Sequence, residues 1–191
     1  MGGWFLLLAG STYAAFLLWR RDPQVLEEHQ LVESTQTAVL LTACAVHGVR
    51  GWRAAGSVET VARLGLAMIC LSFAVRETDI DRLSESPVWP VTELVARGIV
   101  VVIWIALGVW ALRRAGELLA GWRTALGPAA WCAAAGGALY VASFALDKRM
   151  LPLTAETSLF VEEAVQLNAC LLLLAAGTVP MLRRAARARL G

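Results

Sequence analysis

Charged side chains are scarce in this sequence of 191 residues. Only 17% of the residues are charged, whereas 58% are hydrophobic. A soluble domain of similar size has about 25% charged residues and roughly 45–50% apolar ones. The deficit of charge excludes an ordinary soluble enzyme and a disordered chain. The formal net charge of +2 is too small for a nucleic-acid-binding protein, so we expect no nucleic-acid partner.

Histidine is rare, and the motifs of several membrane enzymes are absent. The 2 histidines are too few for the zinc site of alkaline ceramidases. No G-x-S-x-G-like serine motif of a rhomboid protease occurs. Glu162-Glu163 is not followed by the arginine and histidines of CAAX-processing proteases. Neither a P-loop nor a G-x-G-x-x-G motif is present. The sequence therefore resembles none of these families.

The 4 cysteines form no C-x-x-C pair, and each falls in a different predicted helix. They are Cys44, Cys70, Cys132 and Cys170. Thiols at this depth in a membrane protein are usually small packing residues. We expect neither a disulfide nor a cysteine-bound metal.

Long hydrophobic runs dominate the chain. A membrane-spanning helix needs about 20 mainly apolar residues, and six segments approach this length: residues 3–19, 32–49, 61–73, 95–112, 126–146 and 160–182. The pattern predicts an all-α, polytopic integral membrane bundle of about six transmembrane helices arranged as three hairpins. Residues 1–191 then form a single transmembrane domain without a soluble domain. We expect the first segment to be retained, because no cleavage site precedes Arg20.

The basic residues indicate an orientation. With six spans, 10 of the 17 Lys and Arg residues fall on the side that holds both termini. Cytoplasmic loops carry an excess of Lys and Arg. The sequence therefore predicts a multi-pass membrane protein with both termini in the cytoplasm, and we expect a bacterial inner membrane.

The acidic residues are distributed even more unevenly. Of the 15 carboxylates, 13 fall on the outer side, and only Glu59 and Glu117 fall on the inner side. Acids contribute little to topology, so topology does not explain the bias. Carboxylates crowded together repel one another unless cations or shared protons intervene. This face of the bundle is therefore the candidate functional site.

Two acidic segments suggest a metal site at this face. Arg76-Glu77-Thr78-Asp79-Ile80-Asp81-Arg82 follows the third run, and Glu162-Glu163 opens the sixth. Carboxylate oxygens suit Ca²⁺, Mg²⁺ or Mn²⁺. The candidate metal ligands are Glu33, Glu77, Asp81 and Glu162. The alternative is a solvated, salt-bridged loop without any bound ion, so the cofactor is left open.

Other polar residues near the same face are candidates for catalysis and substrate binding. Glu163 and His29 are the candidate general bases. Gln166 and Asn168 enter the sixth run, where polar groups usually face the bundle interior. Arg76 and Arg97 suit a lipid phosphate, because guanidinium binds it through two parallel donors. Arg97 has an alternative partner, since Glu93 lies four residues earlier.

Helix packing follows from small and bulky residues. Ala129, Ala133 and Gly137 recur every four residues, which lets helices approach closely in lipid. We therefore expect this fifth helix near the centre of the bundle. Residues 98–110 are bulky and apolar, so we expect the fourth helix to face lipid. The similar stretches 31–36 and 160–166 suggest an internal duplication of hairpins.

Three functions remain open from the sequence. The first is a non-catalytic membrane protein with a lipid-binding, assembly or complex-subunit role, which we favour. The second is a divalent-metal-dependent enzyme acting on a lipid head group. The third is a cation- or proton-coupled transporter with a site near the membrane midplane. The expected partners are membrane lipids together with a protein partner or a second copy of the chain.

Overall fold

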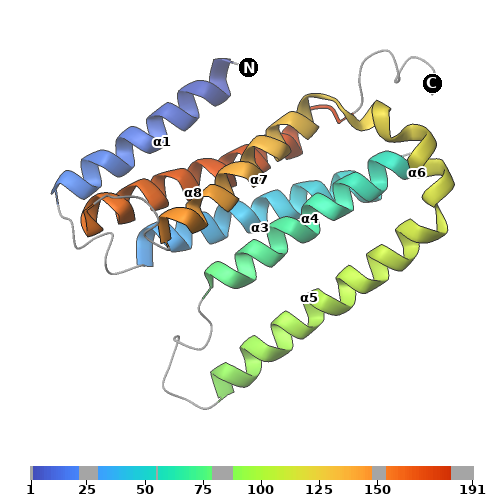
Figure 1. Ribbon diagram of the computed structural model, residues 1–191, viewed down its shortest axis with the longest axis horizontal. Coiled ribbons are helices and arrows are strands. Elements are labelled where there is room, and N and C mark those ends of the chain that lie inside the picture. The colour runs from blue at the N-terminus through green and yellow to red at the C-terminus, as the bar shows by residue number, and fades with distance from the viewer. Residues whose placement is uncertain (1, 22–29, 55, 79–87, 148–153, 182–191) are drawn as a thin grey trace.

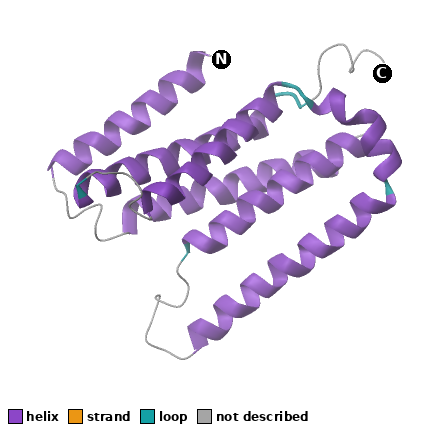
Figure 2. Ribbon diagram, in the orientation of Figure 1, coloured by secondary structure: helices purple, strands orange, loops and turns teal. Residues whose placement is uncertain are grey.

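The computed structural model describes residues 2–21, 30–54, 56–78, 88–147 and 154–181. Within these ranges the chain is helical and contains no β-strand (Figure 1 and Figure 2). The all-α prediction is therefore confirmed. The long helices are α1 (Gly2–Arg21), α3 (Gln30–Trp52), α4 (Ser57–Glu77), α5 (Val88–Arg113), α7 (Pro128–Asp147) and α8 (Ala155–Thr178). A short helix, α6 (Ala115–Gly121), and a 3-10 turn, η2 (Trp122–Ala125), join α5 to α7.

Local sequence signals set several helix ends. Pro128 is the first residue of α7, a position where the missing N–H costs nothing and the fixed φ suits a helix. The Thr154 hydroxyl accepts a hydrogen bond from Thr157 N at 3.3 Å and thereby caps α8. Pro180 follows the end of α8 at Thr178 and prevents its continuation. The element boundaries thus follow capping chemistry as well as hydrophobicity.

The central helix of the bundle is α8, which packs against α1, α3, α4 and α7 (Figure 1). The expectation that the fifth predicted helix, α7, lies at the centre is wrong, because α7 packs mainly against α8 alone. Its small residues still bring the two helices together. A Cβ added at Gly136 would lie 3.0 Å from the carbonyl oxygen of Ala169. Close approach therefore depends on Gly136, whereas Gly137 has no neighbour within 4 Å.

The core lies between α3, α4, α7 and α8. Its buried residues are Leu40, Ala43, Cys70, Ala74, Tyr140, Ala169, Cys170 and Leu173. Cys70 and Cys170 are buried, Cys44 and Cys132 are partly buried, and all four are free thiols. The cysteines are therefore packing residues, as the sequence predicts. Most of this core consists of small side chains, which is typical of helices that approach closely in a membrane.

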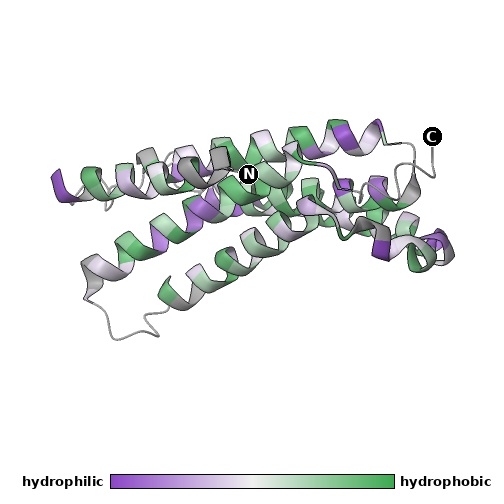
Figure 3. Cartoon of the chain, turned by 90° about the horizontal axis from the view of Figure 1, so that it is seen from above, coloured by the Kyte–Doolittle hydropathy of each residue, from purple (hydrophilic) through white to green (hydrophobic). Residues whose placement is uncertain are grey.

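The helices α1 and α5 lie at the periphery. The helix α5 packs mainly against α4 and has no buried residue, which agrees with the expected lipid-facing helix. Its exposed side chains include Ile99, Val102 and Ile105. Hydrophobic residues run along the outside of the long helices in Figure 3. Such a surface suits lipid rather than water, because large contiguous apolar patches are rare on soluble proteins.

Within the described ranges, three helices are long and apolar enough to cross a membrane. They comprise residues Val58–Glu77 of α4, Val88–Arg113 of α5 and Thr157–Thr178 of α8. In α1 the described apolar segment is shorter, Leu7–Leu17. The membrane character of the chain is therefore supported. The six-span arrangement and the cytoplasmic termini stay predictions.

Candidate functional site

The four core helices place polar side chains at one level of the bundle interior. Gln36 comes from α3, Glu77 from the end of α4, Tyr140 from α7, and Glu163 and Gln166 from α8. Gln36, Tyr140, Glu163 and Gln166 are buried, and Glu77 is partly buried. We call these five residues the polar layer. Polar groups inside a membrane bundle are costly and usually mark function, so the polar layer is the candidate functional site.

Glu163 and Gln36 join α8 to α3 within the polar layer. The Gln36 Nε2 group donates to Glu163 Oε2 at 2.7 Å and lies 3.5 Å from the backbone oxygen of Glu163. Glu163 is only 7% exposed and Gln36 is 0% exposed. The other amide atom, Gln36 Oε1, is buried and has no hydrogen-bond donor within the described residues. The pair therefore contains a buried carboxyl group and a buried acceptor without a donor.

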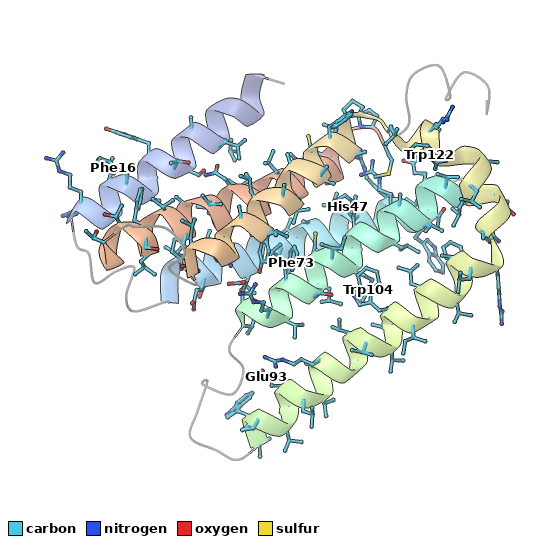
Figure 4. The ribbon with its side chains drawn as sticks, viewed as in Figure 1. Phe16, His47, Phe73, Glu93, Trp104 and Trp122 are labelled. Atoms are coloured by element: carbon cyan, nitrogen blue, oxygen red, sulfur yellow. The ribbon has the colours of Figure 1, made fainter. Side chains whose placement is uncertain are left out.

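Tyr140 connects the other members of the polar layer. Its hydroxyl donates to Glu77 Oε1, and the Gln166 side chain also hydrogen-bonds to it. The ring of Phe73 stacks on the Tyr140 ring with centroids 3.7 Å apart and planes inclined by 6°. The Arg76 guanidinium carbon lies 5.8 Å from the Tyr140 ring centroid, in cation–π range. Figure 4 labels Phe73 on α4, which faces α7 at this point. Tyr140 is therefore fixed both by hydrogen bonds to its hydroxyl group and by contacts to its ring.

Two further carboxylates act on Glu163 from neighbouring helices. Glu33 lies one turn before Gln36 on α3, and Glu77 ends α4. Both lie within electrostatic range of Glu163. Three of the acids that the sequence analysis singled out, Glu33, Glu77 and Glu163, therefore gather at one end of the bundle. We call this end, which also holds Glu93 and Glu162, the acidic end.

Asn168 does not join the polar layer. Its Nδ2 group donates to Thr12 Oγ1 of α1 and to the backbone oxygen of Ala164, both at 2.7 Å. Glu163 faces α3, Gln166 faces α7 and Asn168 faces α1. The expected inward row of polar residues on the sixth span is therefore divided among three helix interfaces.

Arg76 and Arg97 lie apart from each other at the acidic end. Arg97 forms an ion pair with Glu93 four residues earlier on α5 (Glu93 is labelled in Figure 4). Arg76 belongs to α4, is exposed, and packs over Tyr140. Only Arg76 is adjacent to the polar layer. The ion pair of Arg97 is the alternative that the spacing predicted.

The predicted metal ligands come together only in part. His29 and Asp81 lie outside the described residues. Among the residues that the structure describes, no group of three or more His, Cys, Asp or Glu side chains is placed to hold a metal ion. Glu33 and Glu162 are both partly buried near the acidic end. The described carboxylates alone therefore form no metal centre.

A second polar cluster lies at the opposite end of the bundle, and sequence reasoning missed it. Arg63 is only 1% exposed. It donates to the backbone oxygens of Ala176 at 2.7 Å and Val179 at 2.8 Å. Arg50 donates to the backbone oxygen of Gly177. These two arginines cap the C-terminus of α8, where the helix dipole favours cations.

His47 completes this cluster, which we call the basic-end cluster (His47, Arg50 and Arg63). His47 Nε2 lies 3.1 Å from the Leu173 backbone oxygen, and Nδ1 lies 3.5 Å from Arg63 Nη1. A neutral ring with its proton on Nε2 satisfies both contacts. Figure 4 shows His47 inside the bundle, away from the acidic end.

Two open grooves lie on the surface. The first has a volume of about 530 Å³ and runs between α1 and α8, lined by Leu8, Ala9, Thr12, Tyr13, Phe16, Phe160 and Asn168. The second has a volume of about 470 Å³ and is lined by Trp52, Ala54, Gly56, Thr60, Leu64, Trp110 and Arg114. The first is almost wholly apolar. The second adds an arginine and two tryptophans at the basic end.

Comparisons of the chain with protein-family models, curated protein sequences and solved structures gave no match.

Proposed function

We propose that this chain is a non-catalytic integral membrane protein that binds a membrane lipid. The observation that carries the proposal is the apolar groove between α1 and α8. The occupant that we propose is an acyl chain, because the groove lies on a helix that is apolar enough to span a membrane. Pockets for small ligands are mostly apolar with a few polar groups.

The polar groups of this groove suit a lipid that carries a hydroxyl or amide group. Asn168 Oδ1 is buried and has no donor within the described residues, whereas its Nδ2 is bound to Thr12. An unsatisfied buried acceptor costs about 1–3 kcal/mol. A lipid O–H or N–H at this depth would remove that cost. The pair Thr12 and Asn168 thus supplies a fixed polar contact along an apolar wall.

The carboxylates support binding rather than catalysis. Several of them are engaged by groups of the chain itself: Glu163 by Gln36, Glu77 by Tyr140, and Glu93 by Arg97. A carboxylate that is held by the protein in this way is poorly placed to take up a metal or activate water. The enzyme alternative therefore has less support than a binding role.

The groove at the basic end supplies a place for an anionic head group. Arg114 lies 5.3 Å from the Trp110 ring centroid, and its Nη1 is 3.8 Å from Glu117 Oε2. Tryptophan and arginine are typical of the membrane–water interface. In the proposed six-span topology this end faces the cytoplasm, and the acidic end lies outside. A protein partner or second copy would cover α5, which has no buried side chain.

Lipid retention tests the proposal. The full chain is purified in a mild detergent and examined by native mass spectrometry, and its unfolding midpoint is measured with and without added phospholipid. Ala9→Trp fills the groove between α1 and α8 and should remove most of the bound lipid. A ligand that binds only the folded state raises its stability, so the variant should also lose most of the lipid-dependent shift.

Val102→Trp is the matched control. Val102 is exposed on α5 and lines neither groove, so this variant should retain lipid as the unmodified chain does. Equal lipid retention by the two tryptophan variants would contradict the proposed groove. Release of a head group or fatty acid from added lipid would replace the binding role by the enzyme alternative.

A further inference from the structure

The polar layer contains a buried carboxyl group, that of Glu163, for which the described part of the chain supplies no ion pair. Within the described residues, the hydrogen-bond partner of the Glu163 side chain is the amide of Gln36. An ionised carboxylate is strongly disfavoured at a site that is 7% exposed, because burial removes its hydration. The contacts of Glu163 thus lack the cation that would balance a negative charge.

Gln36 Oε1 provides a second, independent observation. Gln36 is 0% exposed, and no residue that the structure describes donates to this oxygen. It belongs to the same planar amide whose Nε2 lies 2.7 Å from Glu163 Oε2. A buried acceptor beside a carboxyl group indicates a missing proton donor. A protonated Glu163 would be such a donor once the amide has rotated by half a turn to present Oε1 to it.

We propose that Glu163 is a proton-binding site inside the bundle and that Gln36 serves both of its charge states. When Glu163 is ionised, Gln36 Nε2 donates to it, as in the structure. When Glu163 is protonated, rotation of the amide by half a turn brings Oε1 to accept the O–H. One side chain therefore satisfies the carboxyl group before and after proton uptake, and the proton moves between water at the acidic end and Glu163 Oε2.

Charged and titratable groups surround Glu163 on every helix that packs against α8. The helix α3 contributes Glu33, and α4 contributes Glu77 with Arg76 beside Tyr140. The helix α7 contributes Tyr140, and α8 contributes Glu162 next in sequence. The helix α1 contributes Arg20 and Arg21 at its exposed C-terminal end.

These groups make the stability of the folded state depend on pH. Glu33 and Glu77 would carry the same charge as an ionised Glu163 and lie within electrostatic range of it, whereas the Gln36 amide is the one side chain of the described residues that donates to it. In the unfolded chain the Glu163 carboxyl group is hydrated and ionises readily. The folded state therefore binds the proton more tightly than the unfolded state, and its stability falls as the pH rises. The proposal does not depend on lipid binding.

The experiment compares unfolding midpoints of the full chain in detergent from about pH 5 to about pH 9, the range in which buried carboxyl groups titrate. The midpoint of the unmodified chain should fall as the pH rises. Glu163→Gln keeps the shape of a neutral acid and should lose at least half of that fall. Glu117→Gln is the control, because Glu117 is exposed on α6 at the basic end, and its profile should follow the unmodified chain.

Infrared spectroscopy supplies a measurement that does not depend on unfolding. A protonated carboxylic acid has a carbonyl stretch that is absent from a carboxylate. A component of this band should disappear with rising pH in the unmodified chain and be missing in Glu163→Gln. In Gln36→Leu the same component should shift to higher frequency, because the O–H loses its acceptor.

Three results would overturn the proposal. The first is parallel pH profiles for the unmodified chain and Glu163→Gln. The second is an unmodified chain whose infrared spectrum shows no carboxylic acid component that titrates. The third is a midpoint that rises with NaCl but not with choline chloride at equal ionic strength, because Glu163 and Gln36 would then hold a sodium ion rather than a proton.

Discussion

The two ends of α8 differ in how their polar groups are balanced. Near its N-terminus, Glu163 is buried beside other acids and is met by one neutral amide. At its C-terminus, the backbone oxygens of Ala176, Gly177 and Val179 are met by two arginines. Cations at a helix C-terminus are favourable. The basic end is therefore fixed by complementary charge, whereas the acidic end can change its charge at small structural cost.

Of the substitutions predicted here, the replacement of Arg63 at the basic end should lower the free energy of unfolding most. Arg63→Met keeps most of the side-chain volume but removes the donor to the buried Ala176 oxygen and the shorter of two arginine contacts to the partly buried Val179 oxygen. We expect the free energy of unfolding to fall by about 3 kcal/mol, since charge-assisted bonds are lost while the desolvation of the guanidinium is recovered. Denaturant unfolding in detergent, followed by tryptophan fluorescence, measures the change.

Arg53→Met is the control for that variant. Arg53 lies at the same end but is exposed, so its replacement should change stability by no more than about 0.5 kcal/mol. If the two variants lose the same stability, Arg63 does not hold the end of α8. The basic end would then be no better balanced than the acidic end.

The contact between α7 and α8 holds Tyr140 of the polar layer in place, and its disturbance should have an intermediate effect. A side chain at Gly136 would meet the Ala169 backbone oxygen at 3.0 Å and the Leu172 Cβ at 3.2 Å. Gly136→Val should therefore cost about 2 kcal/mol and displace Tyr140 from Glu77. Labelling of the buried thiol Cys170 by a membrane-permeant reagent should accelerate.

Gly137→Ala separates packing from helix propensity. No atom lies within 4 Å of a Cβ at Gly137, and alanine favours helix over glycine by about 0.5–1 kcal/mol. This variant should be as stable as the unmodified chain or slightly more stable, with unchanged labelling of Cys170. Faster labelling in Gly137→Ala would show that either glycine supports the contact.

The sequence predicts the helices better than their arrangement. Each long helix overlaps most of one of the six apolar runs, because burial in lipid requires a continuous hydrophobic stretch. The sequence also predicts that α5 faces lipid, because its side chains are almost uniformly bulky and apolar. The centrality of α8 does not follow, since small residues indicate that a helix has a close neighbour but do not identify the neighbour. For the same reason, the sequence does not show that Gly136, rather than Gly137, lies at the contact with α8.

The polar groups illustrate the same limit. The acids Glu33, Glu77 and Glu163 are visible in the sequence because they flank apolar runs. Tyr140 is not visible, since a lone tyrosine in an apolar helix usually packs without a partner acid. Arg63 is not visible either, since a single arginine near the start of an apolar run does not show which helix end it meets. Its Nε lies 3.7 Å from Glu59 Oε1, but its main partners come from the far end of α8.

The ion pair of Arg97 with Glu93 should have the smallest effect. Arg97 is 59% exposed, and exposed pairs four residues apart on a helix contribute about 0.3–0.5 kcal/mol. Arg97→Gln should therefore change the unfolding midpoint by less than any variant above, and lipid retention should not change.

The salt dependence of unfolding gives a sharper test, because screening weakens an exposed ion pair much more than a buried one. The small difference between Arg97→Gln and the unmodified chain should vanish at high salt, whereas the loss in Arg63→Met should persist. A large fall in the unfolding midpoint or in lipid retention in Arg97→Gln would instead show that Arg97 has a functional role on α5, outside the four-helix core.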